Sequence, residues 1–370
     1  MELSFARGGE PGLIKYEGGI VDTSELPRNS SLLVIKASRF YCTDYVVTST
    51  RELVWTPTYV LTCSAPETPP SISLSGPAEI RPPASKDAVS TTTITAKVTA
   101  NGQPKAGVAV TLSNTVDFTS GGHTTGHTSP RPVAALNDKK TSITLSTDAQ
   151  GEAKFTFTAP QAAGQHTIKA ECQGCTSPAT HSIKVRVPDL EELTADTLQP
   201  ASYILVGNTG YPGQNHIGNH WFTSQSKSGL VKVIEVMRDS GWGQVGVNDG
   251  NLEWGGLFDI KGNWAPSHES HREGNEVDIS FSRPKPPNSK QKKTTYDKLC
   301  EKGNTALDVQ TLWHKDDGFQ EHYHLYLDGT GLRKDAGGKC CTQVKQAKKD
   351  KLGQPVPNAA GKAVMVTACE

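Results

Sequence analysis

Alternation of side chains with a period of two is the feature that most constrains what this chain can fold into. Residues 91–99 are β-branched at most positions, and residues 152–158 alternate small or aromatic side chains with polar ones. Such alternation gives a strand one buried and one exposed face, whereas a helix needs a period of about 3.6 residues. Short strands of this kind, separated by turn residues, recur across residues 71–187. The pattern predicts an all-β sandwich.

Proline-rich and acidic stretches predict where the sandwich begins and ends. Residues 64–70 carry more proline than a central strand or a helix tolerates, and an acidic stretch bounded by proline follows the last predicted strand. We therefore expect a multidomain chain. Its parts are a small β-rich segment at 1–65 with strands at 31–36 and 59–63, the sandwich at 71–187, a linker at 188–200 and a further domain at 201–370.

Charge and hydropathy exclude two classes of function. The chain of 370 residues has 38 basic and 38 acidic side chains, so its formal net charge is zero. A nucleic-acid-binding protein needs a basic excess to neutralise phosphates, so no nucleic-acid partner is expected. No stretch approaches the length of apolar sequence that spans a bilayer, so no membrane span is expected either. The first thirty residues contain no run that resembles the apolar core of a signal peptide.

The cysteines nevertheless favour an extracytoplasmic location, whether periplasmic, cell-surface or secreted. Their number is even, eight, and structural disulfides form in oxidising compartments. The expected pairs are Cys42 with Cys63, Cys172 with Cys175, and Cys300, Cys340, Cys341 and Cys369 among themselves in an order left open. The spacing of Cys172 and Cys175 also suits a redox pair or half of a metal site, but the pair follows a β-rich segment rather than lying in a βαβ unit.

Two short motifs combine metal-ligating residues with a strand pattern. Asp278 alternates with apolar neighbours and therefore lies on the polar face of a strand, with His271 on the loop before it. The same alternation puts His322 and His324 on one face of a second strand. Two such strands can close around one ion. Imidazole plus carboxylate in a set of three ligands is the chemistry of catalytic zinc.

A histidine six residues before an aspartate, followed by His-x-His, resembles the signature of the lysostaphin, D-Ala-D-Ala metallopeptidase and Hedgehog-type zinc peptidases. Residues 200–330 are most similar to penicillin-insensitive murein endopeptidases and D-Ala-D-Ala carboxypeptidases. The resemblance implies an α+β domain with a mostly antiparallel sheet, and one Zn²⁺ per chain bound by His271, Asp278 and His324. It also implies a zinc metallopeptidase that hydrolyses peptidoglycan peptides, in cross-links or stem peptides.

The same resemblance supplies two candidates for the group that moves protons. One branch of the family has a glutamate three residues before the last zinc histidine, here Glu321, and another uses the first histidine of His-x-His, here His322. We expect Glu321 as the base and His322 as the transition-state stabiliser, with the reverse assignment left open. The sequence departs from the family at Glu276, where a small residue is usual, and at Ser270, which directly precedes His271 instead of standing one residue away.

Several other residues of this part have expected roles around the site. Arg272 and Arg238 are candidates for stabilising an oxyanion. The wall of the cleft is expected to include Asp249, Trp254 and Asp259, whereas His216, His220, His268 and His314 are expected to be solvated loop histidines beside it. A lysine-rich run at 283–293 is expected to be a solvated loop. An apolar stripe over residues 230–237 predicts a core-facing helix that ends before Gly241.

The predicted sandwich is similar to bacterial Ig-like domains of the invasin and intimin type, on the strand at 108–112, the hairpin at 147–158 and the strand at 164–171. In that family such domains are spacers or adhesive modules, which implies other cell-surface components as partners. An alternative function follows, that of a non-catalytic surface-binding or adhesion protein with a structural zinc site. His123 and His127 lie in a loop, and because their spacing brings two histidines together only on a helix, no metal site is expected there.

Overall fold

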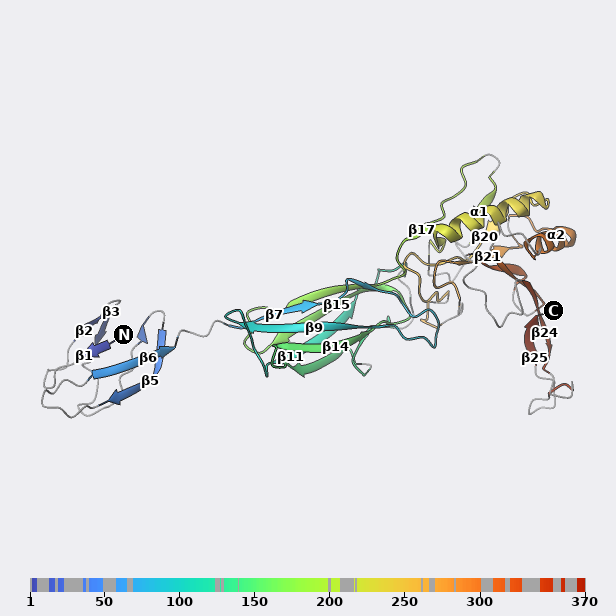
Figure 1. The fold of residues 1–370 in the computed structure, drawn as a ribbon. Coiled ribbons are helices and arrows are strands. Elements are labelled where there is room, and N and C mark those ends of the chain that lie inside the picture. Colours follow the sequence, from blue (N-terminus) through green and yellow to red (C-terminus); the bar gives the residue numbers. More distant parts are fainter. Residues whose placement is uncertain are drawn as a thin grey trace.

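The computed structural model describes most of the chain from residue 69 onward, and for residues 1–68 only the backbone of six strands. Beyond residue 68 the undescribed residues are 124–126, 128–129, 139, 199–200, 207–215, 217, 261, 266–269, 283, 301–308, 317–319, 328–339, 349–353, 357–364 and 370, with backbone alone at 316, 341–346 and 366–369. The described elements form three groups that follow one another along an elongated molecule (Figure 1).

The first group contains two small sheets. Its strands are β1 (Glu2–Ser4), β2 (Leu13–Tyr16), β3 (Gly19–Asp22), β4 (Lys36–Ala37), β5 (Phe40–Thr48) and β6 (Thr58–Ser64). Strands β2 and β3 form a hairpin, and the other four pair in the order β1–β6–β5–β4. Strand β6 confirms the strand predicted at 59–63. Most of the strand predicted at 31–36, and the side chains of the expected Cys42–Cys63 pair, lie outside the described residues.

The second group is the predicted sandwich. Its strands are β7 (Ser71–Ser75), β8 (Glu79–Ile80), β9 (Thr91–Ala100), β10 (Gln103–Pro104), β11 (Ala109–Val116), β12 (Ala135–Leu136), β13 (Ser142–Ser146), β14 (Glu152–Thr158), β15 (Gly164–Cys172) and β16 (Ala179–Val185). They form two five-stranded sheets, one ordered β10–β9–β14–β12 with β7 also on β9, the other β13–β11–β15–β16–β8. Ala153, Phe155 and Phe157 of β14 are buried while the residues between them are exposed, as the alternation predicts.

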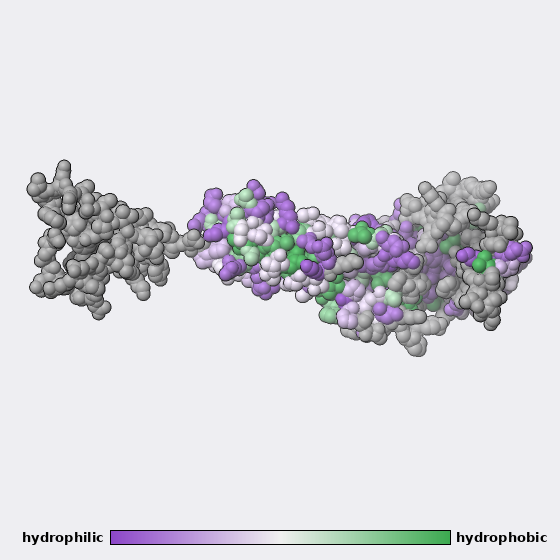
Figure 2. Space-filling view, turned by 90° about the horizontal axis from the view of Figure 1, so that it is seen from below, coloured by the Kyte–Doolittle hydropathy of each residue, from purple (hydrophilic) through white to green (hydrophobic). Residues whose placement is uncertain are grey.

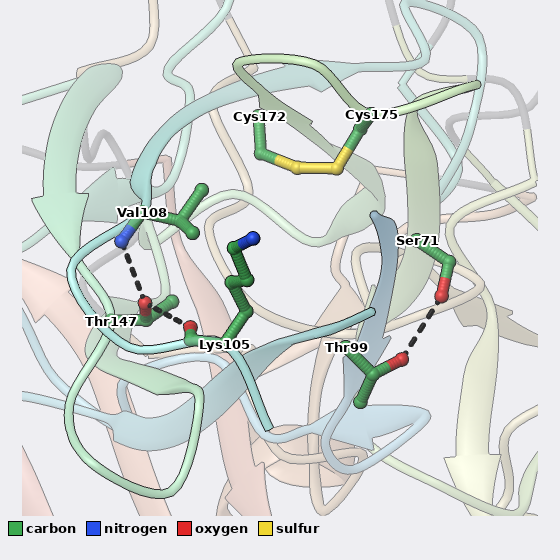
Figure 3. Close-up of a disulfide and its surroundings, with 7 residues drawn as sticks. All are labelled: Ser71, Thr99, Lys105, Val108, Thr147, Cys172 and Cys175. Atoms are coloured by element: carbon green, nitrogen blue, oxygen red, sulfur yellow. Dashed lines mark hydrogen bonds between the residues drawn. A yellow bond between two sulfur atoms is a disulfide. The ribbon is translucent and has the colours of Figure 1, made fainter. Parts of the chain in front are cut away.

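Polar and covalent links close the turns of the sandwich (Figure 3). The predicted Cys172–Cys175 disulfide is present and joins the end of β15 to the loop before β16. The Thr147 hydroxyl accepts a hydrogen bond from the Val108 amide at 2.9 Å and donates one to the Lys105 carbonyl at 2.7 Å. Figure 2 shows hydrophilic and intermediate residues over most of the visible sandwich surface, with smaller hydrophobic areas between them.

The third group combines a large mixed sheet with two helices. Its elements are β17 (Leu190–Glu192), β18 (Tyr203–Leu205), β19 (Trp221–Thr223), α1 (Ser224–Asp239), β20 (Val245–Val247), β21 (Glu276–Ser280), α2 (Ser289–Cys300), β22 (Gln310–Asp316), β23 (His322–Tyr326), β24 (Cys340–Ala347) and β25 (Met365–Cys369). Strands β17 and β19 pair with each other, and the seven-stranded sheet has the order β18–β20–β21–β23–β22–β24–β25. Only its β18–β20 and β22–β24 pairings are parallel among the described strands.

Helix α1 confirms the helix predicted from the apolar stripe. The Thr223 hydroxyl caps its first turn by accepting a hydrogen bond from the Ser226 amide, and Gly241 follows its end with a φ of 92°. Leu230, Val233, Ile234 and Met237 are buried in one core with Val277, Ile279, Tyr323 and Leu325 of the sheet. The apolar face of β21 and β23 is thereby covered, and their polar residues project from the other face. Among the described residues, no helix is long and apolar enough to cross a bilayer.

The lysine-rich run is a loop, as the sequence predicts, only over residues 284–288. Its C-terminal part is the first turn of α2, whose start is fixed by Asn288 and Gln291. The Asn288 side chain accepts from the Gln291 amide at 2.9 Å, and the Gln291 side chain accepts from the Asn288 amide at 2.8 Å. This reciprocal pair is a capping box, a signal that the sequence carries. The predicted pairing among the last four cysteines is confirmed for Cys300 and Cys340.

The sandwich core gives the first prediction. Phe157 is fully buried, whereas Phe118 of the same unit is 69% exposed. Phe157→Ala should lower the free energy of unfolding by about 3–5 kcal/mol because it removes buried apolar surface and leaves a cavity. The matched change Phe118→Ala should alter the free energy of unfolding by no more than about 0.5 kcal/mol. Urea unfolding followed by circular dichroism measures both, and equal losses would contradict this core assignment.

Candidate metal centre

The register of β21 and β23 brings the two predicted motifs together. Asp278 lies directly opposite His324, and Ser280 lies opposite His322. His324 Nδ1 is 2.8 Å from Asp278 Oδ1, and His271 Nε2 is 3.5 Å from the same oxygen. The rings of His271 and His324 are nearly perpendicular, with centroids 4.8 Å apart. We call His271, Asp278 and His324 the strand-face cluster.

A strained turn places His271 beside the strand. His271 has a left-handed backbone with a φ of 60°, and its amide donates to Glu276 Oε2 at 2.9 Å. Gly274 follows with a φ of 83°, and its amide donates to Asn251 Oδ1 at 2.9 Å. A β-carbon on Gly274 would lie 2.2 Å from a methyl carbon of Leu190, so only glycine fits this turn. The glycine of the sequence motif therefore has a structural reason.

The donor chemistry of the strand-face cluster fits a divalent metal ion. One ligand atom from each residue lies within 4.8 Å of the others, and the three side chains are buried. Burial alone raises the pKa of Asp278, but the neighbouring imidazoles outweigh it and hold that pKa well below its usual range. Burial alone lowers the pKa of His324, but hydrogen bonds to Asp278 and Glu276 raise it to about 9. These carboxylates favour positive charge, and the His324 proton has to leave before the ring can bind a metal ion.

Glu276 supports two residues of the cluster at once. Its Oε2 atom accepts the His271 amide and lies 3.2 Å from His324 Nε2. Burial raises the pKa of Glu276, but the hydrogen bond and charge of His324 and the charge of His271 outweigh it and lower the pKa to about 2. A carboxylate on the far nitrogen of a ligating histidine fixes its ring and raises its basicity. These contacts are a physical reason for a glutamate at position 276.

Asp249, expected in the cleft wall, lies behind the cluster. Its carbonyl accepts the Asp278 amide at 2.8 Å, and its carboxylate accepts from the side chains of Asn219 at 2.8 Å and Asn248 at 3.1 Å. Burial and the charge of Asp278 raise the pKa of Asp249 to about 6, against opposing effects of His271 and Asn219. Asp249 therefore helps to position Asp278.

The structure separates the two residues expected to move protons. His322 Nε2 lies 3.6 Å from Asp278 Oδ1, its Nδ1 lies 2.6 Å from the Gln320 carbonyl oxygen, and its ring stacks on His314. Its side chain is 19% exposed, so it forms the edge of the strand-face cluster that solvent reaches. His314 thus packs beside the cluster rather than lying in a solvated loop.

Glu321, the other residue expected to move protons, has its carboxylate bound by groups outside the cluster. Its carboxylate accepts from the Lys292 ammonium of α2 and, at 3.1 Å, from the indole of Trp313. Lys292 lies over the Phe281 ring, and Trp313 belongs to the core between the helices and the sheet. The Glu321 carboxylate thus points toward the helix-covered face, whereas the cluster is on the opposite face. The residue comes just before β23, where strand alternation does not fix its direction.

The oxyanion candidates also form other contacts. Arg272 Nη2 donates to Gln161 of the sandwich at 2.8 Å, and Arg238 donates to the Ser202 hydroxyl at 2.8 Å. His220, expected to be solvated, is buried, with Nε2 at 3.0 Å from the Val247 carbonyl oxygen. His268 lies outside the described residues.

A second group of metal-ligating residues overturns two expectations. His123, His127, His216 and Asp259 each place a ligand atom within 4.8 Å of the others, and we call them the interface cluster. His216 was expected in a solvated loop, but it is 2% exposed. His123 and His127 were not expected to share a metal site, yet their ligand atoms belong to the same group. Two groups of described residues, not one, can therefore hold a metal ion.

Comparisons with known proteins gave matches among solved structures alone. No family model and no curated protein matches the chain. The D00–D0 domains of intimin are 18% identical, with 36% of this chain and 58% of that chain covered and a TM-score of 0.22. Adhesin InvE of Yersinia pseudotuberculosis is 13% identical, with 60% and 73% covered and a TM-score of 0.28. Domains 4–9 of surface layer protein SbsC are 12% identical, with 75% and 30% covered and a TM-score of 0.22. None of these three neighbours is described as a zinc peptidase.

The role of Glu276 gives the second prediction. Glu276→Gln keeps the size of the side chain but removes its charge, so it should weaken zinc binding by about 10- to 100-fold. Competition with a chromophoric chelator measures this affinity in a chain that also carries Asp259→Asn, so that the strand-face cluster is assayed alone. The matched change Glu321→Gln should leave the affinity unaltered. A similar loss from both changes would show that Glu276 has no special contact with the ligands.

Proposed function

We propose that residues 201–370 form a zinc-dependent peptidase that hydrolyses peptide bonds of bacterial peptidoglycan outside the cytoplasm. The observation that carries this proposal is the arrangement of three buried ligands, His271, Asp278 and His324, with the partly exposed His322 beside them. Structural zinc sites take four protein ligands, whereas catalytic sites take three and leave one position for water or substrate. The strand-face cluster offers three protein ligands, the number typical of catalytic zinc sites.

The residues around the cluster have different roles in the proposed reaction. A zinc ion bound here would supply an activated water and a polarised carbonyl. His322 is the acid–base group, because it borders the cluster, contacts solvent and has its Nδ1 oriented toward the Gln320 carbonyl, which leaves Nε2 directed to Asp278. Glu276 and Asp249 hold the ligands in place. We assign no acid–base role to Glu321, since its carboxylate is bound by Lys292 and Trp313.

The substrate class rests on the sequence motifs and on the cell compartment that the disulfides imply. The His-x6-Asp and His-x-His pattern is similar to that of enzymes that act on peptidoglycan peptides. The disulfides Cys172–Cys175 and Cys300–Cys340 are typical of an oxidising compartment, where peptidoglycan is found. The Ig-like sandwich would then present the peptidase to the wall or bind other surface components.

A second function is favoured by one specific contact. Glu276 Oε2 lies 3.2 Å from His324 Nε2 and accepts the His271 amide, so a small rotation would make Glu276 a fourth ligand and close the site. A closed site is structural. The protein would then be a non-catalytic surface-binding or adhesion protein, with its binding function in the Ig-like sandwich.

The third prediction separates these two functions. His322→Ala leaves the three proposed ligands intact, so zinc content should be unchanged. Hydrolysis of purified peptidoglycan fragments should fall by at least about 100-fold, the low end of what a positioned acid–base group contributes. Glu321→Gln is the matched comparison and should keep turnover near that of the unaltered protein. Mass spectrometry of released peptides and elemental analysis provide the two measurements.

Two outcomes would contradict the peptidase proposal or its details. Loss of turnover in Glu321→Gln but not in His322→Ala would reverse the assignment of the base. An unaltered, zinc-loaded protein that binds cell walls but releases no peptide from any fragment would favour the adhesion function.

A further inference from the structure

The interface cluster is built from two parts of the chain that are distant in sequence. His123 and His127 come from the loop between β11 and β12 of the sandwich, while His216 and Asp259 come from loops of the C-terminal part. The sandwich and the C-terminal part are adjacent in Figure 1. The cluster therefore lies where the two parts meet.

The three imidazoles surround the Asp259 carboxylate. His216 Nε2 is 2.7 Å and His123 Nδ1 is 3.6 Å from Asp259 Oδ1, and His127 Nε2 is 3.4 Å from Asp259 Oδ2. The ring centroids form a nearly equilateral triangle, with sides of 5.0, 5.3 and 5.7 Å. One nitrogen or oxygen atom from each of the four side chains lies within 4.8 Å of the others, close enough for one metal ion to bind all four.

Burial makes this arrangement costly unless something binds to it. His123, His216 and Asp259 are at most 2% exposed. Neither ring nitrogen of His123, nor Nδ1 of His216, has a hydrogen-bond partner among the described residues. A buried polar atom without a partner is destabilising, so several in one place call for a ligand.

Neighbouring residues contact the cluster from both parts of the chain. The Trp264 ring stacks on His127 with centroids 3.9 Å apart, and the Trp264 amide donates to Asp259 Oδ2 at 2.6 Å. Arg131 fixes the sandwich loop by donating to the carbonyls of Asp117, Phe118 and Ser120. Such support from neighbouring residues is typical of metal sites.

We propose that the interface cluster is a second zinc site, structural in kind, which fastens the Ig-like sandwich to the C-terminal part. Three imidazoles and one carboxylate complete a tetrahedral coordination shell, so no position is left for substrate. This site differs from the strand-face cluster, which has three ligands from one sheet and its preceding loop. The proposal does not depend on the peptidase function.

The contacts next to the cluster show what the metal would stabilise. The Leu257 amide donates to the Gln161 carbonyl and the Val187 amide donates to the Trp254 carbonyl, at 2.8 and 2.9 Å. A β-carbon on Gly256 would lie 2.7 Å from the Gln161 carbonyl oxygen, so the backbones approach closely there. A metal bound by ligands from both sides would hold these backbone contacts together.

Zinc stoichiometry of full-length variants tests the proposal. The unaltered protein, loaded with Zn²⁺ and dialysed, should contain two zinc ions per chain. His216→Ala should contain one, His271→Ala should contain one, and the double variant should contain none. Asp259→Asn keeps the shape of the side chain and should also contain one, which covers the case in which His216→Ala misfolds. The control His181→Ala, which alters a sandwich histidine bonded to the Pro77 carbonyl, should contain two.

Hydrogen exchange tests the proposed fastening role. The segments that contain the Val187 and Leu257 amides should exchange faster in His216→Ala and Asp259→Asn than in the unaltered protein, because the contact between the two parts opens more often. His271→Ala should leave their exchange unchanged. Zinc content of two in a folded Asp259→Asn variant would overturn the site. Loss of one zinc ion without faster exchange of these segments would overturn its role as a fastener. Neither outcome tests the strand-face cluster. Among these variants, those that carry His271→Ala test zinc binding at that cluster.

Discussion

The pairing of Asp278 with His324 across β21 and β23 is the interaction on which the metal centre depends. Their side chains meet at 2.8 Å because the register puts the two residues directly opposite each other. Since side chains alternate along a strand, a slip of one residue would turn Asp278 into the core and an apolar neighbour toward the metal. The apolar partners of α1 and α2 on the other face therefore fix the register, and through it the position of the ligands.

The loops that precede β21 connect this centre to the sandwich. Asp259 belongs to the interface cluster, while Asp249 and His271 of the same stretch belong to or support the strand-face cluster. Between them, the Gly256 amide donates to the Arg272 carbonyl, and the Arg272 guanidinium donates to Gln161 of the sandwich. A movement of the sandwich would therefore reach the backbone next to His271. The two clusters have different ligand sets, and these hydrogen bonds connect them.

Local patterns in the sequence predict the strands and the helix that depend on local side-chain periodicity. They do not predict contacts between residues that are distant in the sequence. Alternation predicted the sandwich strands and the polar face with His322 and His324, and the apolar stripe predicted α1. Alternation does not report that Lys292 binds the Glu321 carboxylate, because Lys292 belongs to α2, where the sequence predicts a loop. The interface cluster joins loops of two separate parts of the chain, and no periodicity reports such a contact.

Anomalous diffraction at the zinc edge, from crystals of the full chain grown with zinc, tests the central claim most directly. The account predicts a peak about 2.0–2.2 Å from nitrogen atoms of His271 and His324 and an oxygen of Asp278, with a non-protein atom in the fourth position beside His322. A difference map without a peak among these three residues, with Asp278 and His324 hydrogen-bonded directly to each other in zinc-loaded crystals, would contradict it.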